Sequence, residues 1–417
     1  MNGQIFNTIP GVWRLAPVLL LLASCQPLVT ERLQGSDVCV ENVQQDNDPA
    51  LAGFAEQDLA RIDSVILTAI ADSAFPGASV SIGTPTTVAY SRGYGTLSYS
   101  DPDSVHETTV YDLASMTKVV ATTTSAMLLY EAGALDLDAR VTEYLPEFGE
   151  SGKDDVRVIH LLTHTSGLIP FRPYHLLGLH ERSEILGAIM SDSLQFEPGT
   201  RVSYSDLGMI TMGRVIEEIA GMTLDSFSTR YIFNPLGMCS TAFRSSNQVD
   251  VENIAPTEVD TLFRKSLVHG VVHDETAYIL GGTAGHAGLF ATAADLSKFA
   301  TMMLTGNTID GKPFLARETI SRFTSRPAGP GQQERAIGWD LRSLEGYTSA
   351  GEYFSRDSFG HTGYTGTSIW IDPELDVYAI LLTNRVHPTR ANRKISAVRP
   401  AFASAVGLPL VSKNRSN

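Results

Sequence analysis

The sequence predicts an α+β fold: one antiparallel sheet, built from both ends of the chain and flanked by helices, with a mostly helical subdomain inserted between the ends. β-prone runs lie within residues 78–90 and again within 338–383, whereas the region between them shows helical periods and little strand character. Helices on the faces of the sheet would bury both layers. We expect the functional site in the cleft between the sheet and the subdomain.

The first elements follow from local patterns. Residues 56–74 carry apolar side chains near the helical period and end before Pro76 and Gly77, which predicts an amphipathic helix. Residues 78–82 and 87–90 are β-prone runs separated by the turn sequence Gly83-Thr84-Pro85. This arrangement predicts a β-hairpin.

The later elements follow from the same periods. After a helix that begins near Ser115, further helices are expected at residues 156–162, 183–190, 207–220, 224–233 and 293–304, with a strand at 288–290. The final strands are expected at residues 338–341, 367–372 and 377–383, and the last helix at 390–405. The domain then spans residues 56–410, its helical insertion covers roughly 111–284, and residues 411–417 form a disordered tail.

The composition is that of an ordinary globular protein. Of 417 residues, 43% are hydrophobic and 18% are charged, so the chain can bury a substantial core. The formal net charge of −15, without any run of Lys or Arg, argues against nucleic-acid binding. An acidic surface that favours solubility is the simpler explanation of the charge.

The N-terminus predicts export. Arg14 is the only charged residue among the first 24, and the apolar run at 15–22 that follows it is too short to span a membrane comfortably. Residues 22–25 resemble a bacterial lipobox, which implies a signal peptide at residues 1–24 and lipidation of Cys25. Residues 25–55 would then be a polar tether to the membrane. Because Gln26 rather than Asp follows the cysteine, we expect an outer-membrane lipoprotein of the cell envelope that faces the periplasm.

Two further cysteines are present. They could pair in an oxidising compartment, but Cys39 lies in the polar tether and nothing in the sequence places it close to Cys239. We therefore expect no structural disulfide.

A Ser-x-x-Lys pattern stands at Ser115 to Lys118. If a helix begins near Ser115, residues three apart share a face, so the Lys118 amine would lie beside the Ser115 hydroxyl. Serine becomes an effective nucleophile only with a neighbouring base or cation, and a helix start adds unpaired N–H groups. The pattern also arises by chance on solvated helix faces, so it needs support from elsewhere in the chain.

Two other segments carry residues suited to the same chemistry. Residues 197–208 place Tyr204 and Asp206 on a turn before a helix. A tyrosine whose pKa is lowered by adjacent Lys118 could act as general base for Ser115, the alternative being a tyrosine packed at a loop corner. Residues 360–367 are small and polar and open onto a strand-like run, whose N–H groups could donate to an oxyanion. His361 in this segment is either a site residue or a hydrogen-bonded surface histidine.

Two further turns are rich in Gly, His and Thr. They lie at residues 161–168 and 281–290. We interpret both as structure around the cleft rather than as reacting groups.

Together, and in this order, Ser115-x-x-Lys118, Tyr204-Ser205-Asp206 and His361-Thr362-Gly363 resemble the S-x-x-K, Y-x-N and K/H-T-G motifs of the serine β-lactamase-related family. The resemblance covers about residues 59–406. The family includes class C β-lactamases, D-alanyl-D-alanine carboxypeptidases (penicillin-binding proteins) and esterases. Residues 269–290 and 383–388 look most like its lipoprotein penicillin-binding, carboxypeptidase-like branch. The resemblance implies a β-lactamase/transpeptidase-like fold.

The resemblance also implies roles for individual residues. Ser115 would attack a carbonyl and become acylated, while Lys118 and Tyr204 would move its proton and later activate water. Backbone N–H groups of Ser115 and Tyr364 would form the oxyanion hole. The residues expected to bind the substrate are Asp206, His361, Thr362 and Gly363. The substrate would be a small peptide, ester or lactam related to peptidoglycan, and the reaction would need neither a metal nor another cofactor.

Two positions depart from the commoner family pattern. Asp206 replaces an Asn, whose amide can donate as well as accept, so we expect weaker β-lactam hydrolysis and a gain on changing Asp206 to Asn. His361 replaces a Lys, so we expect carboxylate binding to be weaker and to depend on pH near neutrality.

Other kinds of protein fit less well. An α/β-hydrolase would need a G-x-S-x-G elbow, which the sequence lacks. The pairs His160/His164 and His269/His273 have the i, i+4 spacing of zinc ligands but not the H-E-x-x-H glutamate. A lipoprotein that binds cell-wall peptides or β-lactams through an acylable serine without turnover remains open. The sequence predicts a serine hydrolase resembling D-Ala-D-Ala carboxypeptidases, with an esterase or weak β-lactamase as the nearest alternative.

Overall fold

A computed structural model describes residue 1 and residues 33–41, 48–100, 102–243, 253–327 and 335–414. Apart from Met1, the predicted signal peptide lies outside these residues, as does the lipidation site Cys25.

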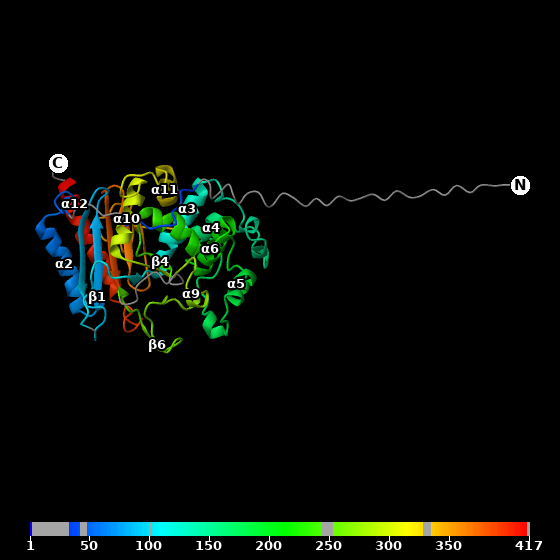
Figure 1. Cartoon of the computed structure of the whole chain (residues 1–417), viewed down its shortest axis with the longest axis horizontal. Coiled ribbons are helices and arrows are strands. Elements are labelled where there is room, and N and C mark those ends of the chain that lie inside the picture. Colours follow the sequence, from blue (N-terminus) through cyan, green and yellow to red (C-terminus); the bar gives the residue numbers. More distant parts are fainter. Residues whose placement is uncertain (2–32, 42–47, 101, 244–252, 328–334, 415–417) are drawn as a thin grey trace.

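One antiparallel sheet joins the two ends of the chain, as the sequence predicts (Figure 1). Its strand order is β2-β1-β11-β10-β9-β8, and Ala78 of β1 lies opposite Thr383 of β11. The hairpin β1–β2 and the strands β8, β10 and β11 match predicted runs. Strand β9, which contains His361, was not predicted as a separate strand. The bounds are β1 Gly77–Gly83, β2 Val88–Gly95, β8 Asp340–Leu341, β9 Phe359–Thr362, β10 Ser368–Asp372 and β11 Val377–Thr383.

Two helices from the chain ends cover one face of the sheet, at the left of Figure 1. They are α2 (Glu56–Ala71) and α12 (Ile395–Asn414). Helix α2 is amphipathic as predicted, with Ile62 and Ile66 buried against the sheet. Helix α12 continues beyond its predicted end, so the tail expected from residue 411 is wrong for residues 411–414.

Within α12, the window Ile395–Ser412 is long and apolar enough to cross a membrane by length and composition alone. In this fold Val398, Phe402 and Val406 are buried beside α2 and the sheet. Packing in the domain therefore accounts for their apolar character.

The other face of the sheet carries α10 and the mostly helical part of the chain. A small sheet, β3-β7-β4, joins the start of this part to its end. The remaining strands are β3 Tyr111–Asp112, β4 Ala242–Phe243, β5 Val259–Asp260, β6 Ser266–Leu267 and β7 Leu289–Ala291. The helices are α3 Thr124–Glu131, α4 Val158–Leu162, α5 Arg182–Ser191, α6 Asp206–Ala220, α7 Leu224–Ser228, α8 Asn234–Leu236, α9 Glu275–Ile279, α10 Ala293–Thr305 and α11 Arg317–Thr324.

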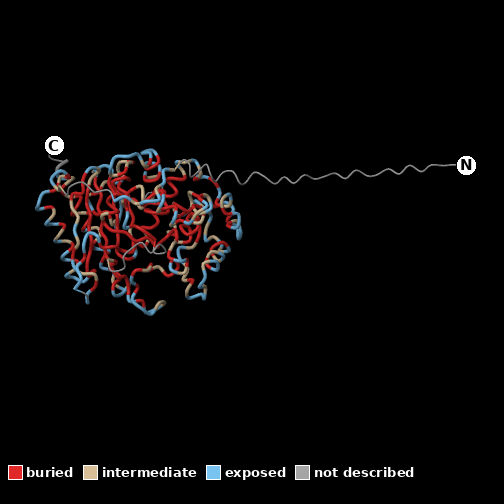
Figure 2. The backbone as a smooth tube through the Cα atoms, viewed as in Figure 1, coloured by how far each residue is buried: buried red, intermediate tan, exposed pale blue. Residues whose placement is uncertain are grey.

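The core is divided by the main sheet into two clusters, and buried chain runs through the middle of the molecule in Figure 2. The larger cluster lies between the sheet and the helical part, and the smaller lies between the sheet and α2 and α12. Residues of the helical part thus share one core with the inner face of the sheet.

Cys39 and Cys239 form a disulfide, so the expectation of unpaired cysteines is wrong. The Ser36 N–H donates to Arg230 O at 2.8 Å, and Asn234 Nδ2 donates to Ser36 O at 2.8 Å. These contacts hold residues of the predicted tether against the turn around α8. The pairing could not be predicted from local sequence patterns because 200 residues separate the two cysteines.

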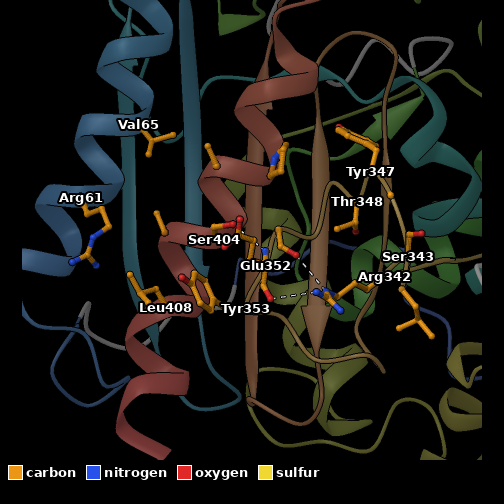
Figure 3. Close-up of a pocket in the computed structure, with 16 residues that line it drawn as sticks. Arg61, Val65, Arg342, Ser343, Tyr347, Thr348, Glu352, Tyr353, Ser404 and Leu408 are labelled. Carbon is orange, nitrogen blue, oxygen red and sulfur yellow. Dashed lines mark hydrogen bonds between the residues drawn. The ribbon is translucent and has the colours of Figure 1, made fainter. Parts of the chain in front are cut away.

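A cavity of about 640 Å³ lies beside α2 and α12, as Figure 3 shows. Arg61, Tyr347 and Ser404 are among the residues that line it. It lies on the α2/α12 side of the sheet and includes none of the residues predicted for the site.

Candidate active site

Ser115 lies on a tight 3₁₀ turn, η1 (Ala114–Met116), and Lys118 opens a π-helical segment, η2 (Lys118–Thr123), that leads into α3. Ala114 has a φ of 47°, a left-handed conformation that non-glycine residues seldom adopt. Strained backbone and π-helical turns both concentrate at functional sites. The predicted regular helix is therefore irregular where the two reactive residues stand.

The predicted contact between the amine and the hydroxyl is present. Lys118 Nζ lies 3.0 Å from Ser115 Oγ, 3.0 Å from His286 O and 2.8 Å from Asp206 Oδ1. The Lys118 side chain is 1% exposed. These three oxygens therefore lie around a buried ammonium, which has only N–H donors.

Tyr204 and Asp206 are held by the start of α6. Ser205, between them, caps this helix by accepting from Gly208 N at 3.1 Å, and its hydroxyl donates to Ile169 O at 2.7 Å. A capped helix start fixes the backbone of both neighbours. This explains why a Tyr-Ser-Asp turn can present two side chains to one lysine.

The Tyr204 ring is surrounded by cationic and aromatic groups. Lys118 Nζ lies 4.9 Å and the Arg335 guanidinium carbon 5.0 Å from the ring centroid. The His164 ring lies 4.6 Å and the His361 ring 6.1 Å away, centroid to centroid. Tyr204 therefore lies in the candidate site and is not merely a tyrosine packed at the corner of a loop.

The electrostatics differ from the expected lowering of the Tyr204 pKa. Burial raises that pKa, and this effect outweighs the opposing influence of Lys118. Burial also disfavours the charged form of Lys118, but Asp206 and Tyr204 outweigh it, so the Lys118 pKa is raised. The resting site therefore holds an ammonium and a neutral phenol.

His361 lies on β9, buried, with Nδ1 2.8 Å from Thr362 O. Because a carbonyl only accepts, Nδ1 carries the proton and Nε2 is a bare acceptor. Burial lowers the His361 pKa to about 4, so the ring is neutral above about pH 5. A neutral ring carries no charge for a substrate carboxylate near pH 7, which differs from the partly protonated histidine expected from the sequence.

The turn after His361 is fastened to the segment before Ser115. Thr365 Oγ1 donates to Asp112 O at 2.6 Å, and Thr367 Oγ1 donates to Leu113 O at 3.0 Å. A Cβ on Gly363 would lie 2.3 Å from Leu113 O, so only glycine permits this approach. Thr362, Gly363 and Tyr364, as predicted, thus lie beside the nucleophile segment.

The turn at residues 281–290 reaches further into the site than expected. His286 supplies the carbonyl that accepts from Lys118, and its Nε2 lies 2.9 Å from Asp274 Oδ1. A Cβ on Gly285 would lie 2.0 Å from Met209 O of α6. The turn is therefore wedged between η2 and α6.

Arg335 was not predicted as a site residue. It precedes β8, and its Nη1 lies 2.7 Å from Asp340 Oδ1. No local motif marks it, because its nearness to Tyr204 is set by the pairing of β8 with β9.

The four histidines of the considered zinc pairs each have a separate partner in the described structure. His160 Nδ1 accepts from Arg157 N, His164 Nδ1 accepts from Ser205 N, and His269 Nε2 donates to Ile254 O. His273 Nε2 lies 2.9 Å from Glu258 Oε2. Among the described residues no group of three or more His, Cys, Asp or Glu is arranged to hold a metal.

Comparisons with known proteins agree with this geometry. A family model described as Beta-lactamase matches residues 60–401. A protein of Salmonella agona (strain SL483) named "Putative D-alanyl-D-alanine carboxypeptidase" is 30% identical over 381 residues, which cover 84% of this chain and 87% of that one.

Solved structures resemble the fold. EstCE1, titled a hydrolase with promiscuous acyltransferase activity, aligns with a TM-score of 0.67 and 23% identity over 85% of this chain and all of that one. An octameric penicillin-binding protein homologue from Pyrococcus abyssi aligns with a TM-score of 0.66 and 23% identity. The alignment covers 85% of this chain and 78% of that one. At such identities the likeness shows the fold alone.

Proposed function

The chain belongs to the Beta-lactamase family of serine hydrolases, and we propose that it forms an acyl-enzyme at Ser115 and acts as a D-Ala-D-Ala carboxypeptidase on cell-wall peptides. The observation that carries the proposal is the buried Lys118 amine, 3.0 Å from Ser115 Oγ and 2.8 Å from Asp206. The name of the 30% identical Salmonella protein supports the choice of substrate.

The proton of Ser115 has a route through these groups. In the resting site Lys118 is an ammonium and cannot accept it. The reactive form is the one in which Lys118 has lost one proton to solvent, so that the amine lone pair is free. The amine then takes the Ser115 proton as Oγ bonds to the substrate carbonyl carbon. On collapse of the tetrahedral intermediate, the proton passes to the leaving amine.

Tyr204 takes part as a neutral phenol in this scheme. Its hydroxyl interacts with both Ser115 and Lys118. It can therefore give its proton to the leaving group and regain one from Lys118, which balances the protons of acylation. Water repeats the sequence in reverse during deacylation.

Ester hydrolysis is the second candidate, and the charge balance of the site favours it. His361 is neutral near pH 7, and the two cations beside Tyr204 each face a carboxylate: Lys118 faces Asp206 and Arg335 faces Asp340. A substrate carboxylate would have to compete for Arg335 or Lys118, whereas an uncharged ester needs no such partner.

A turnover panel separates these candidates. A D-Ala-D-Ala peptide, a short-chain ester and nitrocefin are incubated with the mature domain, with Ser115→Ala and with Ser125→Ala, a buried serine of α3 that serves as matched control. We expect Ser115→Ala to abolish hydrolysis and Ser125→Ala to retain it. Release of D-Ala supports the carboxypeptidase, and turnover of the ester alone supports the esterase. Acylation without product release would support a non-hydrolytic binding protein instead.

A further inference from the structure

A buried network of charged side chains reaches the nucleophile segment from outside the site described above. Asp112 Oδ1 accepts from the N–H of Ala114, the strained residue before Ser115, at 2.8 Å. Asp112 Oδ2 accepts from the N–H of His273 at 2.7 Å. The carboxylate therefore joins the turn that carries Ser115 to the backbone of His273.

The side chain of His273 is fixed by its own partners. Its Nε2 donates to Glu258 Oε2 at 2.9 Å, since a carboxylate only accepts. Glu258 is in turn held by Arg390, whose Nη2 lies 2.6 Å from Oε2 and 2.8 Å from Glu275 Oε1. His273 is 4% exposed and Glu258 is 4% exposed, so these bonds are made away from solvent.

The fixed imidazole ring faces Tyr364. The two rings stack at 5.8 Å between centroids with an interplanar angle of 23°. Tyr364 is 48% exposed, and the Arg385 guanidinium carbon lies 4.4 Å from its ring centroid. The backbone of Tyr364 lies in the turn whose neighbours Thr365 and Thr367 bond to residues 112 and 113.

We infer that His273 is a positioning residue for the oxyanion hole: its backbone holds the Ser115 turn through Asp112, while its ring holds Tyr364. The inference rests on the proposed function and on the role that the family resemblance implies for the N–H groups of Ser115 and Tyr364, which is to form the oxyanion hole. Because the two N–H groups come from separate segments, catalysis depends on the spacing between them. His273 contacts both segments and neither reacting atom, so it acts through geometry.

The test replaces the ring while the backbone N–H remains. His273→Ala should lower the acylation rate constant for an ester about 10- to 100-fold, since small misplacements of catalytic groups have effects of this order. The substrate dissociation constant should change by less than about 3-fold. His273→Phe retains a ring against Tyr364 and should restore most of the rate. His387→Ala, which removes a histidine stacked on Tyr99 at 6.4 Å, is the matched control.

A thionoester analogue distinguishes a change in the oxyanion hole from a general loss of rigidity. The measured quantity is the preference for the oxygen ester over the thionoester, which a general loss of rigidity would not change. Its sulfur accepts hydrogen bonds weakly, so an intact oxyanion hole favours the oxygen ester, and His273→Ala should reduce that preference. Tyr364→Leu removes the ring stack from the side of Tyr364 and should reduce the preference for the oxygen ester in the same way. Combining it with His273→Ala should give no further reduction. Thermal denaturation of each variant shows that it is folded.

The outcomes are distinct. Wild-type acylation by His273→Ala, or a lower rate with an unchanged oxygen-to-sulfur preference, would overturn this inference and leave the proposed function standing. If His273→Ala does not fold, an unchanged preference in Tyr364→Leu overturns it. Absence of acylation at Ser115 in the wild-type protein would overturn the proposed function and this inference together.

Discussion

Asp206 lies 2.8 Å from the amine of Lys118, at a position where the resemblance led us to expect an amide. A carboxylate there raises the Lys118 pKa, whereas an amide would not. One atom pair therefore sets the charge of the resting site.

Changing Asp206 to Asn should raise nitrocefin turnover and move the acidic limb of the kcat/KM profile to lower pH. The new amide can donate to the lactam carbonyl, and loss of the carboxylate lowers the Lys118 pKa, so the free amine is present at lower pH. Steady-state rates between pH 5 and 9 check both effects. Asp225→Asn, in the first turn of α7 and outside the candidate site, is the control. An unchanged profile would show that Asp206 does not set the protonation of Lys118.

His361 makes a second residue-scale prediction. Burial lowers its folded pKa to about 4, whereas in the unfolded chain the value is about 6.5. Between these values the unfolded state binds more protons, so the free energy of unfolding should fall as pH is lowered from about 6.5 to about 4. Denaturant unfolding at several pH values across this range should show that the free energy of unfolding depends less on pH in His361→Asn than in the wild type.

His180→Gln is the matched control, because His180 is exposed. This variant should show the same dependence of the free energy of unfolding on pH as the wild type. An equal slope for His361→Asn and the wild type would contradict the assignment of a neutral, buried His361.

At the scale of elements, the turn at residues 281–290 sets the spacing of η2 and α6. Gly285→Ala would place a Cβ 2.0 Å from Met209 O, so backbone must move. We expect a loss of about 1–3 kcal/mol or more in the free energy of unfolding, together with lower kcat, because Lys118 and Asp206 open these two helices. Urea unfolding and steady-state kinetics measure both effects.

Gly187→Ala in α5 is the control, since a Cβ there meets nothing within 4 Å. It should raise the free energy of unfolding by about 0.5–1 kcal/mol through helix propensity. If both variants behaved alike, the turn would not be a wedge between the two helices.

Much of this element-scale arrangement could be predicted from the sequence. The helical period at residues 207–220 and the β-prone runs near both ends gave elements close to α6 and the main sheet, because local pattern decides them. The three motifs also named residues that meet in one site. Arg335, the wedge at Gly285 and the stack of His273 on Tyr364 could not be predicted, because strand pairing and loop packing place them.

At the scale of the whole molecule, the main sheet brings the chain ends together and the Cys39–Cys239 disulfide holds the described start of the chain to the helical part. Leu33 also packs against the larger core. The predicted anchor at Cys25 precedes this attachment by few residues.

Replacing Cys39 and Cys239 by Ser should lower the free energy of unfolding by about 2–4 kcal/mol, because the cross-link closes a long loop in the unfolded chain. Hydrolysis should be retained, since neither cysteine contacts the site. Denaturant unfolding of the wild type with and without a reductant gives the matched comparison. Unchanged stability, or lost hydrolysis in a folded variant, would contradict this account.

Whether Ser115 is the nucleophile can be tested by the mass of the protein after exposure to a labelled penicillin, followed by peptide mapping. We expect one acyl group per chain, located on Ser115, that forms in the wild type and not in Ser115→Ala. Lys118→Met should prevent it, whereas Lys298→Met, which removes a buried lysine paired with Asp295 outside the site, should not. An adduct on another residue, or an equal adduct in Ser115→Ala, would contradict the assignment of Ser115 as the nucleophile.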